Sequence, residues 1–190
     1  MVEQQIKRRK YLLAHDIDGG LVDYDYPLSL CFSGCGFLIS YYIGVISCFR
    51  ERAPHFISNI HRIYGSSGGA LAGVTIIAGF STERMLKATS GLLFYVTSKK
   101  FGLIDPFLKL ETYLRGVLRD ELPEDIHRLC TNRLFINLTH FRSFKPKLVS
   151  EYHTKEDLID AIICSCYVPC IFGFFPPKFR GQAKSYEQYT

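Results

Sequence analysis

Residues 28–49 have the sequence LSLCFSGCGFLISYYIGVISCF, and this stretch decides the fold. Residues 28–33 form a short apolar run that predicts a buried strand, and Gly34-Cys35-Gly36 predicts a turn. A helix is predicted from Phe37 to Arg52, because apolar residues recur there at helical spacing. These residues are Ile39, Tyr42, Ile43, Ile46 and Phe49. The stretch therefore predicts a strand, a glycine-rich turn and a helix, which is how an α/β fold begins.

The same order of elements recurs directly downstream. Residues 60–64 predict a second strand, residues 65–69 (GSSGG) a tight turn, and residues 70–78 an apolar helix. Apolar strands that alternate with helices are typical of a strongly buried parallel sheet. The first half of the chain therefore predicts an α/β fold with crossover connections.

The second half continues this pattern less regularly. Helices are predicted over residues 82–98, over residues 105–118, and from Thr154 to a point before Pro169. Asp105-Pro106 is typical of a helix start, and the run from Thr154 to Asp157 fits a capping box. Two further strands, residues 134–139 and 148–152, predict a hairpin.

The composition fits one globular domain, residues 27–190, after a polar N-terminal tail of residues 1–26. With 47% hydrophobic and 22% charged residues, the chain is not expected to be disordered, collagen-like or a coiled coil. The formal net charge of +5 is mild. No arginine-rich stripe with interleaved aromatics is present, so nucleic acid is not an expected partner. The 7 cysteines include no Cys-x-x-Cys pair, which favours core thiols in a reducing compartment over a zinc site.

Membrane spans are a competing interpretation of two uncharged stretches, residues 26–49 and 63–82. Both exceed the roughly 18 residues that make a transmembrane helix a candidate. Each, however, has a cluster of glycine and serine in its interior, and such clusters are typical of turns. We therefore favour strands and turns of an α/β fold over two transmembrane helices.

The strongest chemical signal lies in Gly65-Ser66-Ser67-Gly68-Gly69, which fits Gly-x-Ser-x-Gly with Ser67 at the centre. A predicted strand precedes it and a predicted helix follows it, which is the context of a nucleophile elbow. Gly65 and Gly69 flank the serine where side chains would block the approach of a substrate. The alternative is an ordinary glycine-serine turn.

The second signal, Gly34-Cys35-Gly36, also lies between a strand and a helix, where backbone amides can bind an anion. Ile39 stands in the place of the third glycine of a dinucleotide fingerprint, and no Lys-Ser/Thr pair completes a phosphate-binding loop. An oxyanion hole and a plain turn remain. Because parallel neighbouring strands end at the same edge of a sheet, this turn and Ser67 are predicted to face each other, as acyl transfer requires.

Four segments, taken in order, resemble the patatin-like phospholipases. They are the two turns with their strands, Cys164 to Pro169, and Pro176 to Gly181. The nearest subgroup is that of adipose triglyceride lipase and adiponutrin. The resemblance runs from about Pro27 to Gly181 and implies a three-layer α/β/α patatin-like domain with a mostly parallel central sheet. It also implies hydrolysis of ester bonds in triacylglycerols or glycerophospholipids by a Ser-Asp dyad, with no metal and no other cofactor.

The resemblance assigns roles to individual residues. Ser67 is the expected catalytic nucleophile, Gly65 and Gly69 belong to its elbow, and Gly34, Cys35 and Gly36 form the expected oxyanion hole. The expected partners are triacylglycerol or phospholipid, the surface of a lipid droplet or membrane, and a protein coactivator. The expected location is the cytoplasm, in association with lipid droplets or membranes.

The chain departs from the family at its end, where Tyr186 takes the place of the dyad aspartate, with Glu187 next to it. No dyad aspartate is found there, so the chain resembles a C-terminally truncated form that lacks its last strands. Asp18-Gly19-Gly20 spells the missing motif upstream of the first strand. A serine without a base is a weak nucleophile. A catalytically inactive lipid-surface or partner-binding fragment is therefore the alternative function.

Two smaller alternatives remain open. His140 or His153 would be the base of an α/β-hydrolase triad, if the fold were of that type. The apolar residues 171–177 would form a buried strand or enter a lipid monolayer.

Overall fold

The computed structural model describes residues 27–105, 107–140, 143–169, 171–173 and 175–183. Its elements are, in chain order, β1 (Leu28–Phe32), the 3₁₀-helix η1 (Gly36–Leu38), α2 (Ile39–Arg52), α3 (Pro54–Ser58), β2 (Ile60–Gly65), α4 (Gly68–Ile77), α5 (Thr82–Thr97), the 3₁₀-helix η2 (Gly102–Ile104), α6 (Leu110–Glu121), α7 (Ile126–Cys130), β3 (Leu134–Thr139), β4 (Pro146–Val149), α8 (Lys155–Cys166), β5 (Lys178–Phe179) and β6 (Gln182–Ala183).

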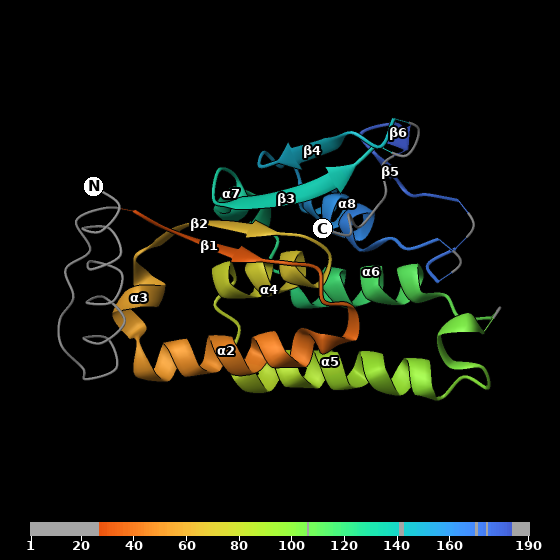
Figure 1. Cartoon of the computed structure of the whole chain (residues 1–190), viewed down its shortest axis with the longest axis horizontal. Coiled ribbons are helices and arrows are strands. Elements are labelled where there is room, and N and C mark those ends of the chain that lie inside the picture. Colours follow the sequence, from red (N-terminus) through yellow and green to blue (C-terminus); the bar gives the residue numbers. More distant parts are fainter. Residues whose placement is uncertain (1–26, 106, 141–142, 170, 174, 184–190) are drawn as a thin grey trace, which may run out of the picture.

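The central sheet has four strands in the order β1-β2-β3-β4. The pairs β1–β2 and β2–β3 are parallel, and β3–β4 is the predicted antiparallel hairpin. Figure 1 shows the helices flanking this sheet, with α4 next to it and the pair α2 and α5 beyond α4. The predicted α/β class with a mostly parallel central sheet is confirmed.

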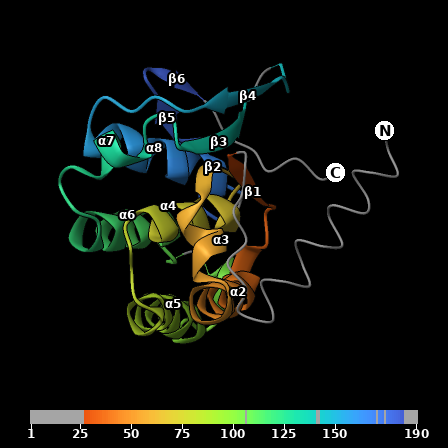
Figure 2. The same cartoon turned by 90° about the vertical axis from the view of Figure 1, so that its left-hand side faces the viewer.

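Helices α4 and α8 pack on the same face of the sheet. Helix α4 contacts β1, β2 and β3, whereas α8 contacts β3 and also touches α4 and α6. The view along the sheet in Figure 2 places α4 and α6 in one row and α2 and α5 in a second row farther from the strands. The buried core lies between the strands and these helices; its fully buried side chains include Ile136, Leu158 and Ile162.

The expectation of strands buried along their whole length is wrong for β1. Its residues alternate, because Leu30 and Phe32 point toward the helices while Ser29 and Cys31 are exposed on the other face. Strand β1 is also the edge strand of the sheet. Of the cysteines described, Cys130, Cys164 and Cys166 are the predicted core thiols, whereas Cys31 and Cys48 are exposed.

The two uncharged stretches do not form long helices. Each divides into a strand, a turn and a helix, namely β1, η1 and α2 in the first and β2 and α4 in the second. Among the helices of the described ranges, none is both long and apolar enough to cross a membrane. The predicted tail of residues 1–26 lies outside the described residues.

One predicted helix start is wrong, and β4 spans Pro146–Val149 rather than the predicted residues 148–152. Helix α6 begins at Leu110 rather than at Asp105, because the Asp105 carboxylate accepts hydrogen bonds from the N–H groups of Phe101 and Phe107 and so closes a turn. A short helix, α3, follows α2 directly at Pro54. The start of α8 is as predicted: Thr154 Oγ1 accepts a hydrogen bond from Asp157 N at 3.1 Å.

Candidate active site

The two glycine-rich turns lie side by side at one edge of the sheet. Because β1 and β2 are parallel with Phe32 opposite Gly65, the turns that follow these residues begin at the same level. A Cβ built on Gly68 would lie 2.5 Å from Cys35 Sγ and 3.4 Å from Gly36 O. The structure therefore brings together the two turns that the sequence singles out.

Ser67 occupies the sharp turn between β2 and α4. Its backbone has φ 51° and ψ −122°, a conformation that residues with a Cβ rarely adopt. The glycines around it are required sterically: a Cβ at Gly69 would lie 2.2 Å from Phe32 O, and one at Gly65 would lie 2.6 Å from Gly69 O. The turn thus has the strained backbone and close approach expected of a nucleophile elbow.

A buried serine from a distant element holds this turn. Ser165, in α8, is completely buried, and its Oγ accepts a hydrogen bond from Ser67 N at 2.8 Å. The same hydroxyl donates to Asn137 O in β3 at 2.9 Å. Ser165 therefore links the turn of Ser67 to both the sheet and α8, a role that sequence reasoning missed. The available signal was a hydroxyl within the apolar run of α8.

A tyrosine holds the other turn. The hydroxyl of Tyr42, in α2, donates a hydrogen bond to Ser33 O at 3.1 Å. Burial raises the pKa of this phenol, so it stays protonated and remains a donor at neutral pH. The ring of Tyr42 also packs on Phe32, with ring centroids 4.9 Å apart. Helix α2 thus fixes the turn that begins at Ser33.

An apolar cavity of about 240 Å³ opens at Ser67. Among the described residues that line it, Ser67 alone carries a hydroxyl, and none is charged. The other lining residues include Gly36, Phe37, Leu110, Cys166, Val168 and Phe172. A cavity with one hydroxyl and an otherwise mostly apolar lining suits an ester with an aliphatic chain better than a polar or charged substrate.

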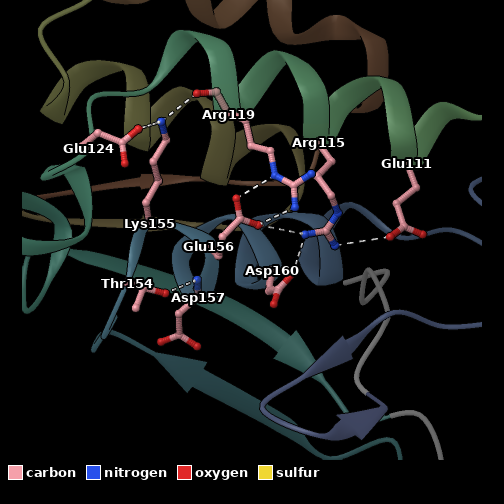
Figure 3. A network of polar contacts seen from close by, with 9 residues as sticks. All are labelled: Glu111, Arg115, Arg119, Glu124, Thr154, Lys155, Glu156, Asp157 and Asp160. Carbon is pink, nitrogen blue, oxygen red and sulfur yellow. Dashed lines mark hydrogen bonds and ion pairs between the residues drawn. The ribbon is translucent and has the colours of Figure 1, made fainter.

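An ion-pair network fixes α6 against α8, the two helices that supply Leu110 and Cys166 to the cavity wall. Figure 3 shows the guanidinium of Arg119 binding both carboxylate oxygens of Glu156, at 2.7 and 2.8 Å. Arg115 binds Asp160 at 2.5 Å and Glu111 at 3.4 Å.

Burial alone would lower the pKa of Arg115, yet its hydrogen bonds to carboxylates raise it. At the end of the network the ammonium of Lys155 contacts Glu124 at 2.8 Å and Arg119 O at 2.7 Å (Figure 3). The network therefore keeps its charges in place and holds the cavity wall.

The histidines considered as bases lie elsewhere. His140 Nδ1 contacts Ser143 Oγ at 3.0 Å in the β3–β4 turn, and His153 is exposed before α8. Neither is among the residues that line the cavity of Ser67. Tyr186, Glu187 and the motif at residues 18–20 lie outside the described residues. In the described ranges, no group of three or more His, Cys, Asp and Glu residues is arranged to hold a metal ion.

The profile of the family described as Patatin-like phospholipase matches residues 30–189, which include both turns.

Curated relatives match most of the chain. The mouse protein named 1-acylglycerol-3-phosphate O-acyltransferase Pnpla3 is 36% identical over 81% of this chain and 37% of its own length. The mouse omega-hydroxyceramide transacylase is 38% identical over 84% of this chain and 27% of its own length. The human patatin-like phospholipase domain-containing protein 2 is 35% identical over 80% of this chain and 30% of its own length. The chain thus spans about a third of the length of these relatives.

Proposed function

We propose that this chain, which belongs to the patatin-like phospholipase family, is a serine acylhydrolase acting on ester bonds of triacylglycerols or glycerophospholipids. In this proposal Ser67 is the nucleophile, and backbone N–H groups of Gly34, Cys35 and Gly36 form the oxyanion hole. The observation that carries the proposal is the single hydroxyl, on a strained turn, in an otherwise apolar cavity. Such a site favours attack on the carbonyl of a lipid ester.

The proposed reaction has two steps. Ser67 Oγ attacks the ester carbonyl carbon and passes its proton to a general base, which returns it to the leaving alcohol as the C–O bond breaks. Water then attacks the acyl-serine through the same base, releasing the carboxylic acid and restoring the hydroxyl. The N–H donors stabilise the negative oxygen that forms in each step.

The acceptor of the acyl group need not be water. The printed names of two relatives are those of an acyltransferase and a transacylase. If the hydroxyl of a second lipid attacks the acyl-serine in place of water, the product is a new ester. Hydrolysis and acyl transfer therefore share the proposed first step.

The general base that would take the proton from Ser67 is where this chain departs from the family. By family spacing Tyr186 stands in the position of the dyad aspartate. A tyrosine hydroxyl is protonated at neutral pH and accepts a proton poorly. We expect hydrolysis by this chain to be slower than by a complete dyad by on the order of 10³-fold or more.

Labelling with a fluorophosphonate tests the nucleophile directly. The reagent forms a bond between phosphorus and Ser67 Oγ as fluoride leaves, so it detects the serine without turnover. Ser66→Ala is the matched control, because Ser66 is the adjacent hydroxyl in the same turn. We expect an adduct on the wild type and on Ser66→Ala and none on Ser67→Ala. An equal adduct on all three proteins would contradict the proposal.

The surface at which the chain acts is a second part of the proposal. We propose that it associates with lipid droplets or membranes in the cytoplasm. Large apolar side chains are exposed on segments next to those lining the cavity: Leu38 is 70% exposed and Phe175 is 87% exposed. Flotation with triolein emulsions should weaken in the double variant Leu38→Ser/Phe175→Ser and not in Leu129→Ser, an exposed leucine of α7. Equal flotation of all variants would refute this placement. A protein coactivator remains a prediction from the resemblance.

A non-catalytic lipid-surface or partner-binding fragment is the second candidate function, and Tyr186, in the position that the family resemblance gives to the dyad aspartate, favours it. It predicts flotation with triolein emulsions without hydrolysis of triolein or phospholipid. Steady hydrolysis by the 190-residue chain that disappears in Ser67→Ala would refute it.

A further inference from the structure

A second apolar cavity lies behind the one that opens at Ser67. It has a volume of about 80 Å³ and is enclosed by α2, α4, α5 and α6. Four aliphatic side chains line both cavities and form the wall between them: Ile39, Leu71, Leu92 and Leu114. We call the cavity that opens at Ser67 the near cavity and the one behind it the far cavity.

The two cavities follow one another along α4, the helix that begins after Ser67. The near cavity touches Gly68 and Leu71, whereas the far cavity touches Leu71 and continues to Thr75. At about 1.5 Å per residue, Thr75 lies roughly 12 Å from Ser67 along the helix. Helix α2 runs alongside, since Ile39 lines both cavities and Ile46 lines the far one.

Two of the polar groups that line the far cavity are engaged with the protein. The hydroxyl of Thr75 donates to Ala72 O at 2.8 Å, and the carboxylate of Glu121 binds Arg84 at 2.6 Å. The remaining lining is mostly aliphatic and aromatic, including Ile43, Val74 and Met85. This mostly apolar lining suits an aliphatic chain better than a polar headgroup.

We infer that the far cavity is the distal subsite for the acyl chain whose carbonyl is bound at Ser67, reached through the wall of four aliphatic side chains. This inference rests on the proposed function. It predicts a preference for esters of long over short acyl chains. A short acyl chain ends in the near cavity and gains nothing from the far one.

The competing explanation is a packing void of the helical layer that no ligand enters. The two explanations differ in what a larger side chain does. Ala88, in α5, lines only the far cavity, and so does Val117, in α6. Filling a void raises or preserves stability and leaves substrate preference unchanged. Filling a subsite displaces the end of the acyl chain.

The experiment compares p-nitrophenyl palmitate with p-nitrophenyl butanoate in the wild type, in Ala88→Leu and in Ser90→Leu. Ser90 is an exposed residue of the same helix, so its variant adds bulk outside the cavity. The far cavity has a volume of about 80 Å³. If a long acyl chain loses contacts in proportion to this volume, its binding weakens roughly 25-fold. We expect Ala88→Leu to lower kcat/KM for palmitate by about that factor, with butanoate and Ser90→Leu unchanged.

A binding measurement separates this inference from the proposed function. Cis-parinaric acid, a fluorescent fatty acid, is titrated into Ser67→Ala with and without Ala88→Leu. Weaker binding with Ala88→Leu supports the subsite even if no ester is hydrolysed, an outcome that would count against the proposed function alone. Unchanged binding and an unchanged palmitate-to-butanoate ratio in a folded Ala88→Leu protein overturn the subsite, whether or not esters are cleaved. Val117→Phe provides the same comparison if Ala88→Leu does not fold.

Discussion

Replacing Ser165 by alanine should loosen the turn that carries Ser67. In the folded protein the Ser165 hydroxyl accepts from Ser67 N at 2.8 Å and donates to Asn137 O at 2.9 Å. The substitution leaves the N–H of Ser67 buried without its acceptor, because Ser67 is only 6% exposed and Ser165 is fully buried. A buried donor left unsatisfied costs about 1–3 kcal/mol. We take about 2 kcal/mol as the expected loss in the free energy of unfolding.

This loss can be measured in two ways. For a domain of this size about 2 kcal/mol corresponds to a fall in Tm of roughly 4–8 °C, and it should also lower the urea midpoint at an unchanged m-value. The matched control is Ser58→Ala, since Ser58 is an exposed serine whose hydroxyl also donates to a backbone carbonyl. Its effect should stay within about 0.5 kcal/mol.

The same variant should react more slowly with a fluorophosphonate, because the backbone of Ser67 is no longer held in its strained conformation. The labelling rate is compared at a temperature where both proteins are fully folded. If Ser165→Ala unfolds at the wild-type urea midpoint and is labelled at the wild-type rate, the hydrogen bond from Ser67 N to Ser165 does not hold the turn.

Ser67→Gly should raise the free energy of unfolding by about 1 kcal/mol, because glycine adopts the positive φ of this turn without strain; a urea midpoint no higher than that of Ser67→Ala would contradict this. Gly69→Ala should prevent stable folding, because its Cβ would lie 2.2 Å from a backbone oxygen of β1, whereas Gly44→Ala, with nothing within 4 Å in α2, should be neutral or stabilising; circular dichroism and soluble yield distinguish them. Burial would raise the pKa of Asp157, but hydrogen bonds from Arg180 and from His153 N, together with the positive charge of Arg180, lower it. The resulting stabilisation is complete above the ordinary aspartate pKa of about 3.9 and is lost as the pH falls through the lower folded value. Arg180→Met should therefore flatten the acid side of the stability profile, and an unchanged profile would show that this pair does not contribute.

The parts of the fold predicted from sequence are those set by neighbouring residues. The units β1–turn–α2 and β2–turn–α4 were predictable because glycine clusters separate an apolar run from a helical repeat. Helix α6 begins later than predicted, since a carboxylate such as that of Asp105 satisfies the N–H groups of a turn as well as those of a helix. The short elements α7, β5 and β6 are too brief to show a period.

The sequence of β1 already contains the alternation of a strand buried on one face, although the run as a whole predicts a strand buried on both faces. Leu28, Leu30 and Phe32 alternate with Ser29 and Cys31, which is the period of a half-exposed strand. Cysteine counts as apolar in such patterns, so the run resembled a continuous buried strand. Only the tertiary structure shows that the exposed face is the one on which Cys31 lies.

The candidate site also has parts that the sequence predicts and parts that it does not. The two turns were identified because each motif is local, and their proximity followed from the parallel pairing of adjacent strands. The contact between Ser165 and Ser67 joins residues 98 positions apart, and no spacing rule predicts which hydroxyl of α8 meets a turn after β2. The far cavity likewise depends on how four helices pack, which the amphipathic pattern of each helix does not determine.

Helix α4 connects the reacting end of the proposed site with its distal end. Two glycines on one face of α4 bring it close to the sheet: a Cβ at Gly69 would lie 2.2 Å from Phe32 O, and one at Gly73 would lie 2.6 Å from Leu134 Cδ1. Because Gly69 and Gly73 are four residues apart, they lie on the same side of the helix. Leu71 and Thr75, which are offset from this side, line the far cavity between α4, α2 and α5. The close approach of α4 to the sheet therefore also sets where the far cavity lies. In the proposed site, both the reactivity of Ser67 and the preferred length of the substrate's acyl chain depend on the placement of this one helix.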